Sequence, residues 1–338
     1  MGKEPRISIV TPSFNQAEYL EECILSVLNQ NYPNLEYIVI DGGSNDGSVE
    51  IIKKYSSALS HWESVPDSGH GDALNKGFRL ATGDILCWLN SDDLLLPWSL
   101  KTVSELFITY PNVSWIHGVQ VSYDSKGRIQ SANQKKINVF DFLLGNYAFL
   151  QQESSFWRRS LWDQAGSHIN TDLKLMVDGE LWSRFFLFAE PCHINCTLGG
   201  WRNTGKNRSS VNQDLIHEEM RLVVEYLRSN CTRSALNLVA QLEDMYRTYE
   251  LIENKPGSRM SYSLPQGNVN RYFYVDILRS ASYLEAIWDS STSKWRLFRS
   301  LFRDPGFTKE DLDSVIQAQE SFLQGMNGIP KKPSWISF

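Results

Sequence analysis

The sequence predicts an α/β protein with a doubly wound, mainly parallel sheet and a helical C-terminal region. Two observations predict the sheet. Short apolar runs alternate with stretches of helical spacing through the first 90 or so residues, and the turn after each run is polar. Strands that alternate with helices in this way form parallel sheets. After about residue 211 the spacing becomes that of long helices, so we expect one domain over 1–210 and a helical region over 211–338.

The elements follow from the position of apolar residues along each stretch. A run such as "LEYIVID" is short and β-branched, as buried strands are, whereas 18–30 has apolar residues three and four apart, as one face of a helix does. The glycine-rich turn 42–48 contains Ser44 and Asp46, either of which can cap the next helix. We expect strands at 6–12, 35–41, 59–65, 84–90 and 113–123, with helices at 18–30, from about 49, and at 71–81.

Beyond residue 150 the pattern is mixed and then helical. An aromatic helix is expected over 178–189 and a strand over 192–202. The expected helices of the last third cover 215–229, 234–252 and 269–288. Residues 254–268 are rich in Pro, Gly and Ser and read as a connecting loop.

Composition excludes several classes of protein. A net charge of −6 and a pI near 5.6 argue against nucleic-acid binding, which needs a basic face. No apolar run approaches the roughly 18 residues of a membrane span, and we expect a cytoplasmic protein. The five cysteines are odd in number and mostly lie in apolar runs, which indicates reduced thiols. "CHINC" has no second ligand pair, so a buried strand is favoured over zinc.

Acids gather where the expected strands end. In a doubly wound sheet the ligand lies at the carboxyl ends of the strands. The first turn has no G-x-G-x-x-G motif, which argues against a dinucleotide site, and no basic glycine-rich loop, which argues against nucleotidyl transfer. Asp92 and Asp93 adjoin a buried strand, so either they precede a helix N-terminus or they bind a divalent metal or a sugar diol. The strand tips are 11–15, 41–46, 66–72 and 90–93.

Three long stretches carry a resemblance to a known family. They are "ISIVTPSFNQAEYLEECILSVLNQNYPNLEYIVIDGGSNDGS", "SGHGDALNKGFRLATGDILCWLNSDD" and "QQESSFWRRSLW". Together they resemble family 2 glycosyltransferases with the GT-A fold, over roughly residues 6 to 200. The resemblance implies an inverting transferase that uses Mn²⁺ or Mg²⁺. Its donor is a nucleoside-diphosphate sugar, with UDP the commonest nucleotide, and its acceptor is a saccharide or lipid-linked hydroxyl, as in cell-surface polysaccharide synthesis.

The resemblance also assigns nucleotide and metal residues. Thr11 and Pro12 border the nucleotide, and Asp41 accepts a hydrogen bond from the base. Asp93 coordinates the metal, while Asp92 lies near the ribose or the metal. The loop expected to run under the nucleotide contains further candidates, for each of which a structural role is equally open: Asp67, His70, Asp72 and Lys76.

The catalytic base expected from the resemblance is Asp178, in "VDGELW". Val177 departs from the Glu that the family usually has there, and N-cap chemistry is the alternative for Asp178. Glu153 and Glu180 are weaker candidates for contact with the acceptor or donor sugar. Relatives often have a histidine where this chain has Thr204, which leaves the third metal ligand open. Three nearby cations either clamp phosphates or lie in a solvated loop: Arg202, Lys206 and Arg208.

Two alternatives accompany this reading. Because Val177 and Thr204 depart from the family pattern, one alternative is a non-catalytic nucleotide-sugar-binding or scaffold protein. The acids at 41, 92, 93 and 178 argue against this alternative. The second alternative concerns the tail, where residues 293–306 have the spacing of a basic amphipathic helix with Arg296, Arg299 and Arg303 on one face. Such a helix either contacts a membrane surface peripherally or packs on neighbouring helices or on a second subunit.

Overall fold

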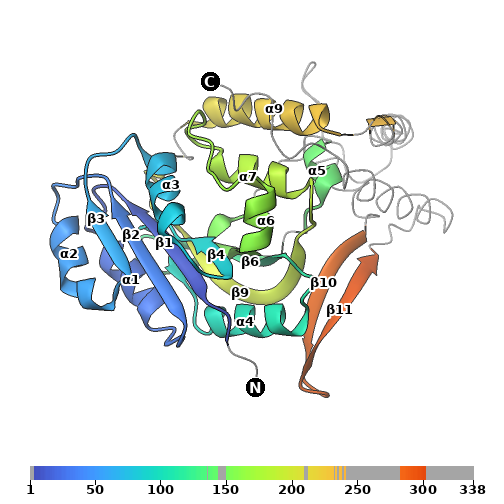
Figure 1. Cartoon of the computed structure of the whole chain (residues 1–338), viewed down its shortest axis with the longest axis horizontal. Helices are drawn as coiled ribbons and strands as arrows, with labels where there is room; N and C mark the ends of the chain where they lie inside the picture. Colours follow the sequence, from blue (N-terminus) through green and yellow to red (C-terminus); the bar gives the residue numbers. More distant parts are fainter. Residues whose placement is uncertain are drawn as a thin grey trace, which may run out of the picture.

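The computed structural model describes residues 4–134, 136–143, 150–208, 212–231 and 282–301, with isolated positions between 233 and 240. Its centre is one twisted sheet, with helices packed against both faces (Figure 1). The strand order along the sheet is β11-β10-β9-β6-β8-β4-β1-β2-β3, with β5 paired to β9 and β7 to β6.

The N-terminal half of the sheet is parallel. β1 pairs with β2 on one side and β4 on the other, and β2 pairs with β3, all in parallel. Because consecutive parallel strands need a crossover, α1, α2 and α3 fill the connections. These elements are β1 (Ile7–Ser13), α1 (Leu20–Leu28), β2 (Leu35–Asp41), α2 (Ser48–Tyr55) with η1 (Ser56–Ala58), β3 (His61–Ser64), α3 (His70–Leu80) and β4 (Ile85–Trp88).

The other half is mixed. β8 runs antiparallel to β4 and β6, whereas β9 is parallel to both β6 and β10. The strands are β5 (Leu94–Leu95), β6 (Trp115–Asp124), β7 (Ile129–Asn133), β8 (Ser155–Arg158), β9 (Cys192–Asn203), β10 (Ser282–Asp289) and β11 (Lys294–Leu301). The helices are α4 (Ser99–Thr109), α5 (Val139–Leu143), η2 (Gln152–Ser154), α6 (Arg159–Gln164), α7 (Val177–Phe185) and α9 (Gln213–Ser229).

Each face of the sheet has its own hydrophobic core, because neighbouring residues of a strand point to opposite faces. On β4, for example, Ile85 and Cys87 pack with α1, α2 and α4, while Leu86 and Trp88 pack with α3, α6, α7 and α9. In Figure 1, α9 lies across α7 and α5, and α4 lies beside β9 away from them.

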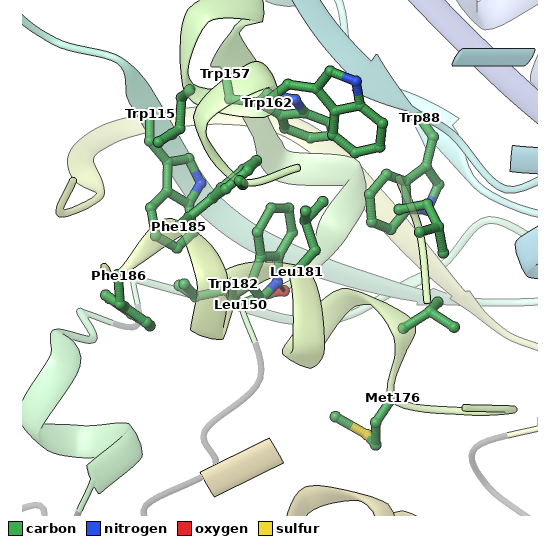
Figure 2. Close-up of a cluster of buried hydrophobic side chains, with 14 of the residues drawn as sticks. Trp88, Trp115, Leu150, Trp157, Trp162, Met176, Leu181, Trp182, Phe185 and Phe186 are labelled. Atoms are coloured by element: carbon green, nitrogen blue, oxygen red, sulfur yellow. Dashed lines mark hydrogen bonds between the residues drawn. The ribbon is translucent and has the colours of Figure 1, made fainter. Parts of the chain in front are cut away.

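An aromatic cluster anchors α7 to the sheet. Trp182 stacks on Trp115 at 5.1 Å and on Trp88 at 5.8 Å between ring centroids, and its Nε1 donates to the Leu150 carbonyl at 3.1 Å. Figure 2 shows this ring among its neighbours from the strands and from α6 and α7. Since Trp182 lies one helical turn after Asp178, the cluster fixes the helix that carries the expected base.

The C-terminal part differs from the expected helices in one region. The helix expected over 215–229 is present as α9, but the stretch from Ser282 to Leu301 is the β10–β11 hairpin, so the expected helices 269–288 and 293–306 are wrong over these residues. Tyr, Ile and Trp favour strands, and the ring pair Trp288–Trp295 (5.6 Å) stabilises the hairpin. The remainder of both stretches, like the expected helix 234–252 and loop 254–268, lies mainly outside the described residues.

This correction removes the reason for expecting a basic helix at a membrane surface. Arginines three residues apart share one face of a helix but alternate between the two faces of a strand. Arg296 lies on edge strand β11, 69% exposed and 3.7 Å from Asp289. Among the described helices, none is both long and apolar enough to cross a bilayer.

Candidate active site

The acid turn, residues 90–93, follows β4 at the carboxyl edge of the parallel strands. Asp93 is buried at 1% exposure. Its Oδ1 accepts a hydrogen bond from the backbone N–H of Arg202 at 2.9 Å, and its Oδ2 accepts from the amides of Asn90 and Gln152 at 3.3 Å each. Asp93 therefore joins the acid turn to β9 and to the segment before β8.

Asp92 is the more open of the two acids. It is half-buried, and its carboxylate has one side-chain partner among the described residues, Asn207 Nδ2 at 3.4 Å. The chain runs from Asp93 straight into β5, and the next helix begins only at Ser99. The alternative that the paired acids cap a helix is therefore wrong.

The pair has an electrostatic cost that a cation would offset. Burial raises the pKa of Asp92; burial and then the charge of Asp92 raise the pKa of Asp93. Mg²⁺ and related ions are held by one or two carboxylates together with phosphate oxygens and water. Within the described ranges no set of three His, Cys, Asp or Glu gathers into a complete metal site. The residues present thus fit a cation shared with a diphosphate, with Asp92 as the accessible carboxylate and Asp93 behind it.

Arg202 lies beneath the acid turn. It is 2% exposed, its Nε donates to the Asp92 carbonyl at 2.8 Å, and its Nη2 pairs with Glu22 at 2.7 Å. The guanidinium also lies over the ring of Tyr19 at 4.7 Å. The expected place of Arg202 in a solvated loop is therefore wrong, because the side chain is buried, whereas its expected role as a phosphate clamp stays a prediction.

Thr204 occupies the position where relatives often have a histidine. Its N–H and hydroxyl both donate to Asn207 Oδ1, at 2.8 and 3.0 Å, so the threonine orients Asn207 beside Asp92. Lys206 and Arg208 are exposed, and Arg208 Nη2 donates to the Lys174 carbonyl at 2.8 Å. Binding of phosphate by these two cations stays a prediction.

The end of β1 offers a buried hydroxyl and an exposed ring. Thr11 and Pro12 are buried, and Thr11 Oγ1 lies 3.1 Å from the Tyr37 hydroxyl. Phe14, just past the strand, is 61% exposed. An exposed aromatic ring at a ligand-binding strand end suits stacking on a nucleobase. The signal for Phe14 was present in the sequence as a lone aromatic in the polar turn "TPSFNQ".

Asp41 holds the loop after β2. It has no exposed surface. Its carboxylate accepts four hydrogen bonds of 2.6 to 3.1 Å, from the N–H groups of Gly43 and Ser44 and the hydroxyls of Ser44 and Ser64. These contacts make Asp41 the organiser of a loop beside the expected nucleotide, and its hydrogen bond to the base stays a prediction.

The α3 segment connects to the acid turn through one histidine. His70 Nε2 lies 2.9 Å from Asn90 Oδ1, and burial lowers the pKa of His70, which favours the neutral ring. Asp72 and Lys76 pair with each other at 3.2 Å on the helix, and Asp67 accepts from a backbone N–H two residues on at 2.8 Å. The structure brings His70 into the acid-turn network; nucleotide contacts of the other three stay predictions.

Asp178 lies in the first turn of α7. It is half-buried, and burial raises its pKa to about 6. Its Oδ1 accepts the N–H of the next residue at 2.7 Å. The carboxyl group thus ionises just below neutral pH, as a general base requires.

Glu180 has a structural role instead of the expected sugar contact. Its two oxygens pair with Arg184 Nε at 2.9 Å and Nη2 at 2.7 Å, and both side chains are almost fully buried. Arg184 in turn donates to the carbonyls of Ala165 and His168. Glu180 therefore secures the α6–α7 connection through Arg184. It faces away from Asp178, because residues two apart on a helix do not share a face.

Glu153 is a further buried acid of the site. It is 2% exposed, and its Oε1 has no hydrogen-bond partner in the part of the chain that the structure describes. Burial, followed by the charges of Asp178 and then Asp92, raises its pKa to about 8. The charges of the expected base and of the acid turn thus both act on Glu153. Asp178, Asp92 and Glu153 therefore lie in one region of the molecule.

The mainly parallel α/β sheet matches the fold of GT-A glycosyltransferases. The model for glycosyl transferase family 2 matches residues 8–164. An uncharacterized glycosyltransferase of Mycobacterium tuberculosis is 32% identical over 212 residues, which cover 61% of this chain and 78% of that protein. The chain belongs to glycosyl transferase family 2.

Two further comparisons concern a second relative in sequence and a solved structure of similar fold. TuaG of Bacillus subtilis, which its name assigns provisionally to teichuronic acid biosynthesis, is 36% identical over 93 residues, 27% of this chain and 37% of TuaG. TarS 1–349 of S. aureus, solved with UDP-GlcNAc, aligns over 81% of this chain and 80% of its own at a TM-score of 0.56 and 18% identity. This chain covers 44% of a longer TarS structure. At this identity TarS shows a shared fold.

Proposed function

We propose that the protein is an inverting glycosyltransferase that moves a sugar from a nucleoside-diphosphate donor to a hydroxyl of a saccharide or lipid-linked acceptor. Family membership supports glycosyl transfer. UDP is the proposed nucleotide because the TarS structure of the same fold contains UDP-GlcNAc, and cell-surface polysaccharide synthesis is supported by the likeness to TuaG. Location in the cytoplasm and self-association stay predictions.

The donor would lie across the carboxyl edge of β1, β2 and β4. Phe14 is proposed to stack on the base, and Asp92, backed by Asp93, to hold Mn²⁺ or Mg²⁺ against the diphosphate. The cation, when bound, neutralises charge on the departing nucleoside diphosphate. The buried network of Asn90, Gln152 and Arg202 keeps the acid turn in place, so the turn needs little reorganisation when the donor binds.

Asp178 is proposed to act as the base in a single displacement. Its carboxylate takes the proton of the acceptor hydroxyl, the acceptor oxygen bonds to the anomeric carbon, and the bond from that carbon to the diphosphate breaks with inversion. The observation that carries this proposal is that burial raises the pKa of Asp178 to about 6, and that the charge of Asp178 helps to raise the pKa of Glu153 to about 8. Acids whose pKa values are pushed apart commonly divide base and binding roles.

The direct test measures transfer with Asp178 removed. Purified protein would be incubated with UDP-, GDP- and dTDP-sugars, simple saccharide acceptors and Mn²⁺ or EDTA, and nucleoside diphosphate release would be followed. Asp178→Asn should lower kcat by about 10²-fold or more, the scale of a missing general base, while the donor-induced rise in Tm is unchanged. The wild-type kcat should rise with pH through about 6, because the ionised carboxylate is the active form.

Asp172→Asn is the matched control, since Asp172 is an exposed acid in the preceding loop. Equal activity of Asp178→Asn and wild type would contradict the assignment of the base. Donor binding without turnover of any donor by the wild type would favour the non-catalytic alternative.

A further inference from the structure

The first turn of α7, which carries Asp178, is held by a carboxylate from a distant helix. Glu219 lies on α9 and is 5% exposed. Its Oε1 accepts the N–H of Lys174 at 2.8 Å, and its Oε2 accepts the N–H groups of Leu175 and Met176 at 2.9 Å each. One side chain therefore fixes three consecutive peptides that lead directly into α7.

These contacts are of a strong kind. A carboxylate that receives several backbone N–H groups forms charge-assisted hydrogen bonds, and its negative charge is favourable at a helix N-terminus. No side chain caps α7 from its own N-cap residue, Met176. Glu219 thus provides from another helix the orientation that a local cap would give.

The packing between α9 and α7 also indicates that α9 holds the first turn of α7. A Cβ on Gly179 would lie 3.0 Å from Met220 Sδ and 2.8 Å from Met176 Cε. The glycine thus leaves room for Met220 of α9 immediately after Asp178. Glu219 and Gly179 therefore place α9 against the one turn of α7 that carries the base.

The same peptides are linked to the acid turn. Arg208 donates to the Lys174 carbonyl at 2.8 Å, and the neighbouring Asn207 donates to Asp92 at 3.4 Å. The far end of α7 is secured independently by Trp182 and by the Glu180–Arg184 pair. Loss of the Glu219 contacts should consequently leave α7 folded and displace chiefly its first turn.

We propose that Glu219 is a positioning residue that sets Asp178 against the acceptor hydroxyl, so that α9 contributes to catalysis without touching the substrate. The proposal rests on the function proposed above. Glu219→Gln keeps the side-chain volume but replaces one acceptor oxygen with an NH₂ group that faces backbone N–H donors. The base should then be misplaced while the donor site, built on other elements, is intact.

The experiment compares Glu219→Gln with Glu218→Gln, its exposed neighbour on α9, in the full chain. Glu219→Gln should lower kcat by about 10- to 100-fold with the donor KM within about twofold of wild type, and Glu218→Gln should match wild type. The decisive readout is the double variant. Because Glu219 acts through Asp178, Glu219→Gln should cost less than about threefold in an Asp178→Asn background.

An equal loss in both backgrounds would show a merely structural role and overturn the proposal, as would an unchanged kcat in Glu219→Gln. Should Glu219→Gln fail to fold, Glu219→Asp decides: it keeps the charge but is too short for all three N–H groups, so its kcat should fall below wild type, and an unchanged kcat refutes the idea. If Asp178→Asn is inactive while Glu219→Gln is normal, the proposed function survives and only this inference fails.

Discussion

The two parts of the candidate site are stabilised by different physical means. The acid turn is held by a contact within the turn, from Asn90 to Asp93, and by polar contacts to Gln152 and Arg202 from two separate segments. The α7 helix is held by an aromatic cluster around Trp182, with Glu219 fixing its first turn. Polar contacts specify the geometry of a turn at little net gain in stability, whereas buried rings contribute mainly to stability. Substitutions in the two parts should therefore separate function from folding.

The largest expected effect follows from removing the central ring of the aromatic cluster. Trp182→Ala should lower the free energy of unfolding by about 3–5 kcal/mol, because it removes a buried ring and leaves a cavity. Urea unfolding measures the loss. Trp98→Ala is the matched control, since Trp98 is 75% exposed, and it should change stability by less than about 0.5 kcal/mol. Equal effects of the two substitutions would show that the cluster does not anchor α7.

The next prediction distinguishes the roles of Asp92 and Asp93 within the acid turn. Asp92→Asn should keep the Tm of the apoprotein but lose the Mn²⁺-dependent increase in Tm produced by donor, with turnover down about 10²-fold. Asp93→Asn should instead lower stability by about 1–3 kcal/mol, because its amide nitrogen cannot accept the hydrogen bonds that the buried carboxylate accepts. Thermal unfolding with and without donor and Mn²⁺ distinguishes them. If Asp93→Asn alone loses metal dependence at unchanged stability, Asp93 is the ligand, as first expected.

The sequence predicted the parallel half of the sheet well, because there a strand or helix is decided locally by the spacing of apolar residues. The hairpin at 282–301 was missed because its aromatic residues also fit helical spacing, and the choice depends on pairing with β9, about 90 residues away. The resemblance found the acids of the site. It gave no role to Asn90, Asn207 or Glu219, whose function depends on partners brought together only by folding. Glu219 in particular resembles a surface acid in "HEEMR".

The last prediction concerns Glu153, whose pKa is raised by charges from both parts of the site, those of Asp178 and Asp92. Its pKa of about 8 is far above the ordinary value near 4.5, so between these pH values the folded protein holds a proton that the unfolded chain has lost. Folding stability should then fall as pH rises across that window, by about 1.4 kcal/mol per pH unit for one proton. Glu153→Gln cannot ionise and removes this contribution. Its Tm relative to wild type should therefore be higher at pH 8 than at pH 5, measured at matched ionic strength. A Tm difference that does not change with pH would mean that the pKa of Glu153 is not raised in the fold, and would contradict this prediction.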